Sequence, residues 1–180
     1  VRGAVLTSAT LTSCGQFDFF LRESGLHGMD AASTLEVPSP FNYAAQGTLI
    51  AAETHADPKN AAQFTTEMVE ALLHDLARVE YGALVLFTSR EQMRQAVDAL
   101  ATSMRAVVLV QNQLPRTQLL ARHRERVAAG EPSIIFGMQS FGEGLDLPGR
   151  LCESVFITKL PFAPPDDPVG ETRAEWLRAV

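Results

Sequence analysis

Hydrophobic positions along the chain follow two alternating patterns. Short runs of apolar and often β-branched residues predict buried strands, which we place at 4–8, 48–51, 83–87, 107–110, 134–136 and 154–158. Apolar residues spaced three and four positions apart predict helices with one buried face. Their stripes fall at 17–21, 64–76, 93–104, 119–127 and 176–177. The chain therefore alternates strand and helix from one end to the other.

This alternation predicts an α/β fold in which helices cover both faces of a parallel sheet. Right-handed crossovers would place the segments that follow the strands at one edge of that sheet. In this chain those segments are 87–89, Gln111, 139–146 and Lys159. Ligands of open α/β sheets bind at such an edge. We therefore expect a ligand site there, with Phe87 itself in the core.

Local signals predict where the helices begin. Ser13 with Gln16 and Ser89 with Gln92 have the spacing of a capping box. The pair Asp57-Pro58 predicts a helix with Asp as its cap and Pro in its first turn. Pro115 opens a further helix, whose Arg122 and Arg126 share one face. We interpret that arginine face as solvated in preference to a nucleic-acid groove.

Composition narrows the class of protein. The chain has 180 residues, 46% of them hydrophobic, which suits one soluble domain with its own core. The formal net charge of −6 argues against a general nucleic-acid binder, although a local basic groove remains compatible with it. No apolar run approaches the roughly 20 residues of a membrane helix, and no signal peptide opens the chain. We expect a soluble, cytoplasmic protein with no membrane contact.

Metal ligation is not predicted. The two cysteines, Cys14 and Cys152, have no ligand spacing and are interpreted as reduced thiols. The four histidines are scattered, and we assign all of them to the surface or to helix faces. They are His27, His55, His74 and His123.

The segment 133–149 is the strongest candidate for chemistry. An apolar run ends in a loop with four glycines and two acids, Glu143 and Asp146. Glycines let a backbone approach a phosphate or ribose, and acids can bind sugar hydroxyls or orient water. From the residues alone, a glycine-rich turn with surface acids explains the segment equally well.

Four segments, in order, resemble motifs of superfamily-two helicases. Their residues are most similar to those of the DinG branch of XPD-like DNA helicases. Segment 139–146 is similar to the fifth motif, 7–11 to the third and 84–89 to the fourth, and Pro-Ser-Pro-Phe-Asn at 38–42 also matches the branch. The resemblance implies a RecA-like fold in an ATP-dependent DNA helicase that moves 5′ to 3′ and serves DNA repair. Residues 1–12 would be the tail of the first motor domain. Residues 13–180 would be the second RecA-like domain, ending before the sixth motif.

The resemblance also implies roles for individual residues. The ATP cleft would be lined by Glu143, Gly144 and Asp146. Nucleic acid would contact Thr88, Ser89, Arg116, Gln139 and Ser140. Ser8 and Thr10 would couple the two sites. For each hydroxyl the plain alternative is helix capping, which is compatible with a phosphate contact.

The catalytic set is incomplete. The chain has no Gly-x-x-x-x-Gly-Lys-[Ser/Thr] phosphate loop and no Asp-Glu-Ala-His-like acid pair. We therefore expect the isolated fragment not to hydrolyse ATP, whereas the full-length enzyme would use ATP and Mg²⁺. Its partners would be single-stranded DNA and the N-terminal motor domain of the same polypeptide. The iron–sulfur cluster of the family needs cysteines that are not in this chain. The alternative is a non-catalytic RecA-like binding or scaffold module.

Overall fold

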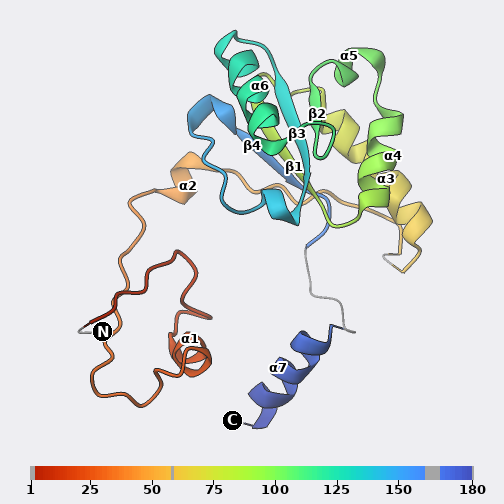
Figure 1. Ribbon diagram of the computed structural model, residues 1–180. Helices are drawn as coiled ribbons and strands as arrows, with labels where there is room; N and C mark the ends of the chain where they lie inside the picture. The colour runs from red at the N-terminus through yellow and green to blue at the C-terminus, as the bar shows by residue number, and fades with distance from the viewer. Residues whose placement is uncertain (1–2, 58, 161–166, 180) are drawn as a thin grey trace. The chain divides into compact units, whose positions relative to one another are not determined.

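The computed structural model describes residues 3–57, 59–160 and 167–179 (Figure 1). The chain divides into two compact units, Val1–Ile50 and Ala51–Val180. Each unit has its own local structure and is described by itself.

The first unit contains two short helices, α1 (Asp18–Glu23) and α2 (Tyr43–Gln46). The predicted strands at 4–8 and 48–51 are wrong, because these described residues form no strand. Their apolar side chains stay in solvent, with Val5 88% and Leu49 97% exposed. An apolar run becomes a strand only when a neighbouring strand satisfies its backbone groups.

The capping box predicted at Ser13 is also wrong. Ser13 and Gln16 pair through their backbones, with N–H···O distances of 2.9 and 3.0 Å. Cys14 and Gly15 between them have φ of 51° and 76°, as in a tight hairpin turn. The helix therefore begins only at Asp18, with Phe17 as its N-cap.

The second unit is built on a four-stranded parallel sheet. Its strands are β1 (Gly82–Phe87), β2 (Val108–Val110), β3 (Ser133–Met138) and β4 (Ser154–Ile157), in the order β2-β3-β1-β4. All three pairings are parallel. The predicted α/β class is confirmed, and the arrangement agrees with a RecA-like fold.

Helices and loops cover the two faces of this sheet (Figure 1). The helices α3 (Ala61–Leu76) and α4 (Arg90–Ala99) pack on one face. The other face packs against α6 (Arg116–Ala128) and against a loop with two short 3₁₀ helices, η1 (Gln139–Phe141) and η2 (Gly149–Leu151). A single turn, α5 (Thr102–Arg105), lies between α4 and β2.

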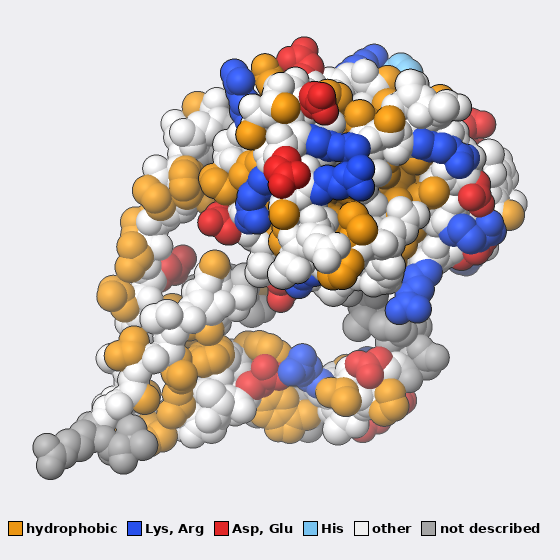
Figure 2. Space-filling view, turned by 45° about the horizontal axis from the view of Figure 1, so that its top comes forward, with side chains coloured by type: hydrophobic (Ala, Val, Ile, Leu, Met, Phe, Trp, Pro, Cys, Tyr) orange, Lys and Arg blue, Asp and Glu red, His pale blue; other side chains and the backbone are white. Residues whose placement is uncertain are grey.

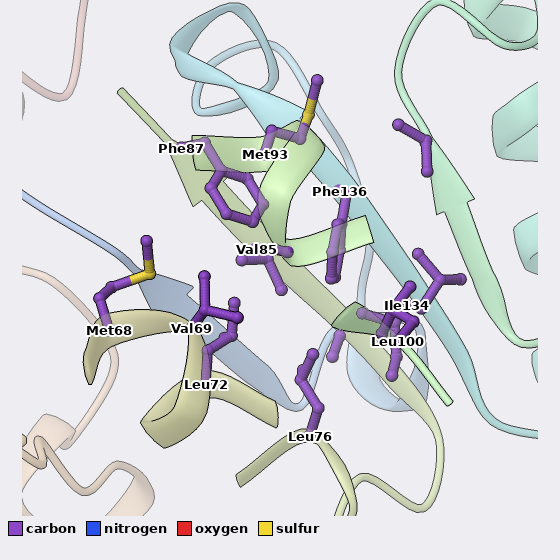
Figure 3. Close-up of a cluster of buried hydrophobic side chains, with 14 residues drawn as sticks. Met68, Val69, Leu72, Leu76, Val85, Phe87, Met93, Leu100, Ile134 and Phe136 are labelled. Carbon is purple, nitrogen blue, oxygen red and sulfur yellow. The ribbon is translucent and has the colours of Figure 1, made fainter. Parts of the chain in front are cut away.

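Successive strand residues alternate between these two cores, as the pleat of a strand requires. On the α3–α4 side, Val85 and Phe87 of β1 meet Phe136 of β3, and the two phenyl rings lie 5.1 Å apart (Figure 3). On the α6 side, Leu84 and Ile135 pack against Leu119. The prediction that Phe87 belongs to the core is confirmed.

The start of α3 differs from the prediction. Helix α3 begins at Ala61, where the Asn60 Oδ1 accepts the N–H of Gln63 at 3.3 Å. Asp57 instead caps a turn before the helix by accepting the N–H of Lys59 at 2.9 Å, and Pro58 lies outside the described residues. Asn60 directly precedes the first residue of α3, so its side chain caps the helix.

Only half of the capping box predicted for α4 is formed. The Ser89 hydroxyl caps α4 by accepting the N–H of Gln92 at 3.5 Å. The Gln92 side chain does not reach back to Ser89 but donates to Thr65 Oγ1 of α3 at 3.2 Å. This contact joins the two helices that cover the same face of the sheet.

The last helix, α7 (Pro168–Ala179), contains Trp176 as predicted. The predicted proline-rich turn at 161–168 lies almost entirely outside the described residues. Among the described helices, none has the length and apolarity that crossing a membrane requires.

Candidate functional site

The strands β1 and β3 are neighbours and end at the same edge of the sheet. Phe87 of β1 pairs in register with Met138 of β3. Thr88 and Gln139 directly follow these two residues, so they begin their loops at the same edge. The sequence prediction that these two segments meet is confirmed by the register.

The outer strands deliver their ends to this edge as well. The N–H of Gln111, which follows β2, donates to the carbonyl of Phe136 at 2.8 Å. On the other side, both the N–H and the hydroxyl of Thr158 donate to the carbonyl of Leu86 at 3.1 Å. Lys159, the next residue, therefore lies at the same edge. Four strand ends thus border one candidate site.

The side chain of Gln111 ties the end of β2 to the start of the loop after β3. Its Oε1 accepts the backbone N–H of Met138 at 2.6 Å. Its Nε2 lies 3.1 Å from the Ser140 hydroxyl oxygen. Gln111 is half-buried and Ser140 is exposed, so the contact fixes a hydroxyl that faces solvent.

Arg116, the first residue of α6, holds the glycine-rich part of the loop. Its Nη2 donates to the carbonyls of Glu143 and Gly144 at 3.4 and 3.1 Å. Its guanidinium also lies over the ring of Phe141, 5.1 Å from the centroid. A cation over an aromatic face adds about 0.5–1 kcal/mol at an exposed site. Arg116 therefore fixes the loop, and its predicted phosphate contact stays a prediction.

Two glycines make this loop conformation possible. A Cβ at Gly137 would lie 2.7 Å from the Cβ of Phe141, which is buried against the sheet. Gly144 has φ of 67°, a backbone conformation that favours glycine. The loop thus needs glycine where Phe141 folds back and where the chain turns past Arg116.

Beyond Gly144 the loop runs along α6 toward η2. Arg124 Nη2 donates to the carbonyl of Asp146 at 3.3 Å. The arginines of α6 thus bind backbone carbonyls of the loop, and Glu143 and Asp146 are exposed. Neither carboxylate takes a hydrogen bond or ion pair from the residues that the structure describes. Both are therefore available as acceptors for a ligand.

His123 holds the far end of the loop. It lies on a face of α6, as expected, but that face is buried and not at the surface. Its side chain is fully buried, with Nε2 2.7 Å from the Leu151 carbonyl and Nδ1 2.9 Å from Ser133 Oγ. A carbonyl only accepts, so Nε2 carries the proton and Nδ1 accepts from the hydroxyl. Burial lowers the pKa of His123, against the raising effect of the Leu151 bond, and the charge of Arg124 lowers it further.

A sequence signal for this residue exists. His123 stands four positions after Leu119 and four before Val127, both of which are buried. It therefore occupies the buried stripe of α6. Because histidine is polar, it does not count as part of an apolar pattern.

The remaining predicted residues are also located. Thr88 is exposed, and Ser89 is half-buried under the cap of α4. Ser8 and Thr10 belong to the first unit, where their hydroxyl oxygens lie 3.2 Å apart. In the face that Figure 2 shows, Lys and Arg side chains are interspersed with Asp and Glu and form no patch of one sign.

Comparison with known proteins decides the family. The profile of the family described as "Helicase C-terminal domain" matches residues 72–180. The chain belongs to this helicase family. It is 39% identical to the ATP-dependent DNA helicase DinG of Photobacterium profundum, over 98% of this chain and 26% of the relative. It is 38% identical to the proteins of the same name from Shigella flexneri and Escherichia coli (strain K12), over 98% of this chain and 25% of each.

The DinG-type resemblance is thereby confirmed, and the chain spans about a quarter of the length of these relatives. The alternative of a non-catalytic scaffold module is not favoured, since these relatives carry the name of a helicase. Among the described residues, no group of three or more His, Cys, Asp and Glu side chains could hold a metal ion. Burial raises the pKa of the Cys152 thiol, which keeps it protonated and unreactive near neutral pH.

Proposed function

We propose that this chain is the C-terminal motor domain of a DinG-type, ATP-dependent DNA helicase that moves 5′ to 3′. In this function it supplies one wall of the ATP cleft and part of the single-stranded DNA track. The observation that carries the proposal is the braced loop 139–148 at the strand-end edge. Gln111 holds the start of the loop through Met138 and the Ser140 side chain, and Arg116 holds its backbone, while two carboxylates and one hydroxyl remain exposed.

The exposed acids of this loop suit the sugar part of a nucleotide. Glu143 and Asp146 are acceptors, so they fit ribose hydroxyls, an orienting water or an arginine, whereas phosphate needs donors. The backbone at Gly144 lets a ligand approach closely. ATP and Mg²⁺ would be gripped mainly by a phosphate loop and a metal-binding acid, which belong to the proposed N-terminal motor domain. Residues 1–12 would be the tail of that domain, and 13–180 the second.

The hydroxyls at the same edge suit a DNA backbone. Thr88 and Ser140 are exposed donors, and Ser89 lies at the N-terminus of the ten-residue helix α4. Helix N-termini and neutral donors commonly bind phosphates. Gln139 and Arg116 complete the proposed track, and Ser8 with Thr10 would couple it to the ATP cleft. Single-stranded DNA and the N-terminal motor domain are the proposed partners, in the cytoplasm.

The test compares the full-length protein with this 180-residue chain. The full-length protein should hydrolyse ATP, and single-stranded DNA should stimulate that turnover. The 180-residue chain alone should show no turnover above background, because half of the composite site is on the other domain. Steady ATP hydrolysis by the chain alone, or a full-length protein indifferent to DNA, would contradict the proposal.

A further inference from the structure

The carboxamide of Gln111 has only one orientation that satisfies both of its contacts. The backbone N–H of Met138 points at one end of the amide at 2.6 Å. That end must be the oxygen, since an NH₂ group there would oppose another donor. The NH₂ group is therefore the end that faces Ser140 Oγ at 3.1 Å, and it donates.

This orientation decides what the Ser140 hydroxyl can do. A hydroxyl has one proton and two acceptor lone pairs. One lone pair of Ser140 receives the hydrogen of Gln111, so the hydroxyl proton cannot point toward that amide. Ser140 is exposed, and its proton is left for a group outside the protein. A phosphate oxygen, which only accepts, is the complementary partner.

We propose that Gln111 is a positioning residue, which turns the Ser140 hydroxyl into a dedicated donor toward the DNA phosphate. Gln111 touches no ligand itself, and its effect on the DNA contact is exerted through Ser140. The inference rests on the proposed function, since it needs single-stranded DNA at this edge. It adds a residue at the end of β2, twenty-nine positions earlier in the chain, that sets the polarity of the contact.

The decisive variant is Gln111→Glu in the full-length protein. The glutamate keeps the side-chain length and can still accept the N–H of Met138. Its second oxygen accepts where the amide donated, so the Ser140 proton turns inward and the hydroxyl offers only lone pairs to the phosphate. We expect binding of a single-stranded oligonucleotide to weaken about tenfold or more, as for the loss of a hydrogen bond to a charged group. Ser140→Ala should weaken binding by about the same factor.

A double-mutant cycle separates this mechanism from simple charge repulsion. In the Ser140→Ala background, Gln111→Glu should cost much less than in the wild type, because the two residues act as one unit. Gln113→Glu is the matched control, since it adds the same charge at an exposed position two residues away. Gln111→Met removes both hydrogen bonds without adding charge, and its smaller loss should vanish in the Ser140→Ala background.

The readouts distinguish positioning from a general loss of structure. The DNA concentration that half-stimulates ATP hydrolysis should rise in Gln111→Glu, while the KM for ATP should not change. Equal costs of Gln111→Glu in both backgrounds, or an equal cost of Gln113→Glu, would overturn the inference and leave the proposed function standing. Wild-type binding that Ser140→Ala does not weaken would also overturn it. A wild-type protein that binds no single-stranded DNA would overturn the proposed function, and the inference with it.

Discussion

Replacing His123 by leucine removes a buried side chain that joins α6, β3 and η2. The change keeps an apolar group of similar size but deletes both hydrogen bonds of the imidazole. The Ser133 hydroxyl is then buried without its partner, while the Leu151 carbonyl is only partly buried and can reach water. A buried polar group that loses its partner costs about 1–3 kcal/mol. The lost bond to the Leu151 carbonyl adds about 1 kcal/mol, and leucine replaces the apolar contacts of the imidazole. We therefore expect the free energy of unfolding to fall by about 2–4 kcal/mol.

Urea unfolding of the chain measures this loss, with Ser133→Ala as the matched control. That control deletes one hydroxyl and leaves the bond from Nε2 to Leu151 in place. It leaves Nδ1 of the buried His123 without its donor, so it should lower the free energy of unfolding by about 1–3 kcal/mol. The loss should be smaller than that of His123→Leu measured beside it, because the bond to Leu151 is kept. A loss below about half a kcal/mol for His123→Leu would place the residue among ordinary surface positions and refute the reasoning.

The same residue gives a pH dependence with a definite sign. Because burial lowers the pKa of folded His123 from its ordinary value of 6.5, the unfolded chain takes up the proton more readily. The stability that neutral His123 contributes is therefore complete above pH 6.5. It is lost as the pH falls below this value through the lower pKa of the folded state. In His123→Leu this part of the pH dependence should disappear, and an unchanged slope would count against a buried neutral imidazole.

Two further outcomes are expected. Gly82→Ala would drive a Cβ into the backbone carbonyls of Arg150 and Leu151, so urea unfolding should show a free energy of unfolding lower by about 3 kcal/mol or more. The control Gly130→Ala has open space but φ of 78° and should cost only about 1 kcal/mol. Equal losses in the two variants would contradict the packing argument. The 180-residue chain should bind single-stranded DNA weakly and with a steep salt dependence in fluorescence anisotropy, because it contacts few phosphates and carries a net charge of −6; tight, salt-independent binding would be incompatible with that.

The parallel sheet could be predicted because its strands are buried on both faces. Such strands read as nearly continuous apolar runs, as 83–87 and 134–136 do. The same signal failed at 4–8 and 48–51, where the described residues have no neighbouring strand to pair with. An apolar pattern indicates a preference for burial. Whether the segment forms a strand depends on a neighbouring strand with which it can pair.

The position of the candidate loop followed from topology, but the contacts that hold it did not. Gln111 and Arg116 reach residues 27 to 29 positions away. No local pattern encodes such contacts, which exist only once β2, β3 and α6 are assembled. His123 was missed for a different reason, because polar residues on a buried stripe look like surface residues until their partners are known.

The most direct test of the proposed motor function is Asp146→Ala in the full-length protein. If Asp146 holds the nucleotide when the two motor domains close, the substitution removes charge-assisted hydrogen bonds worth roughly 1.5–3 kcal/mol. ATP affinity or turnover should then fall by about one to two decades. Stability should change by less than about half a kcal/mol, because the side chain is exposed. Melting without nucleotide and titration with ATP on one preparation give both values. Lost affinity at unchanged melting temperature is the predicted result, and a lowered melting temperature with intact affinity would contradict the account.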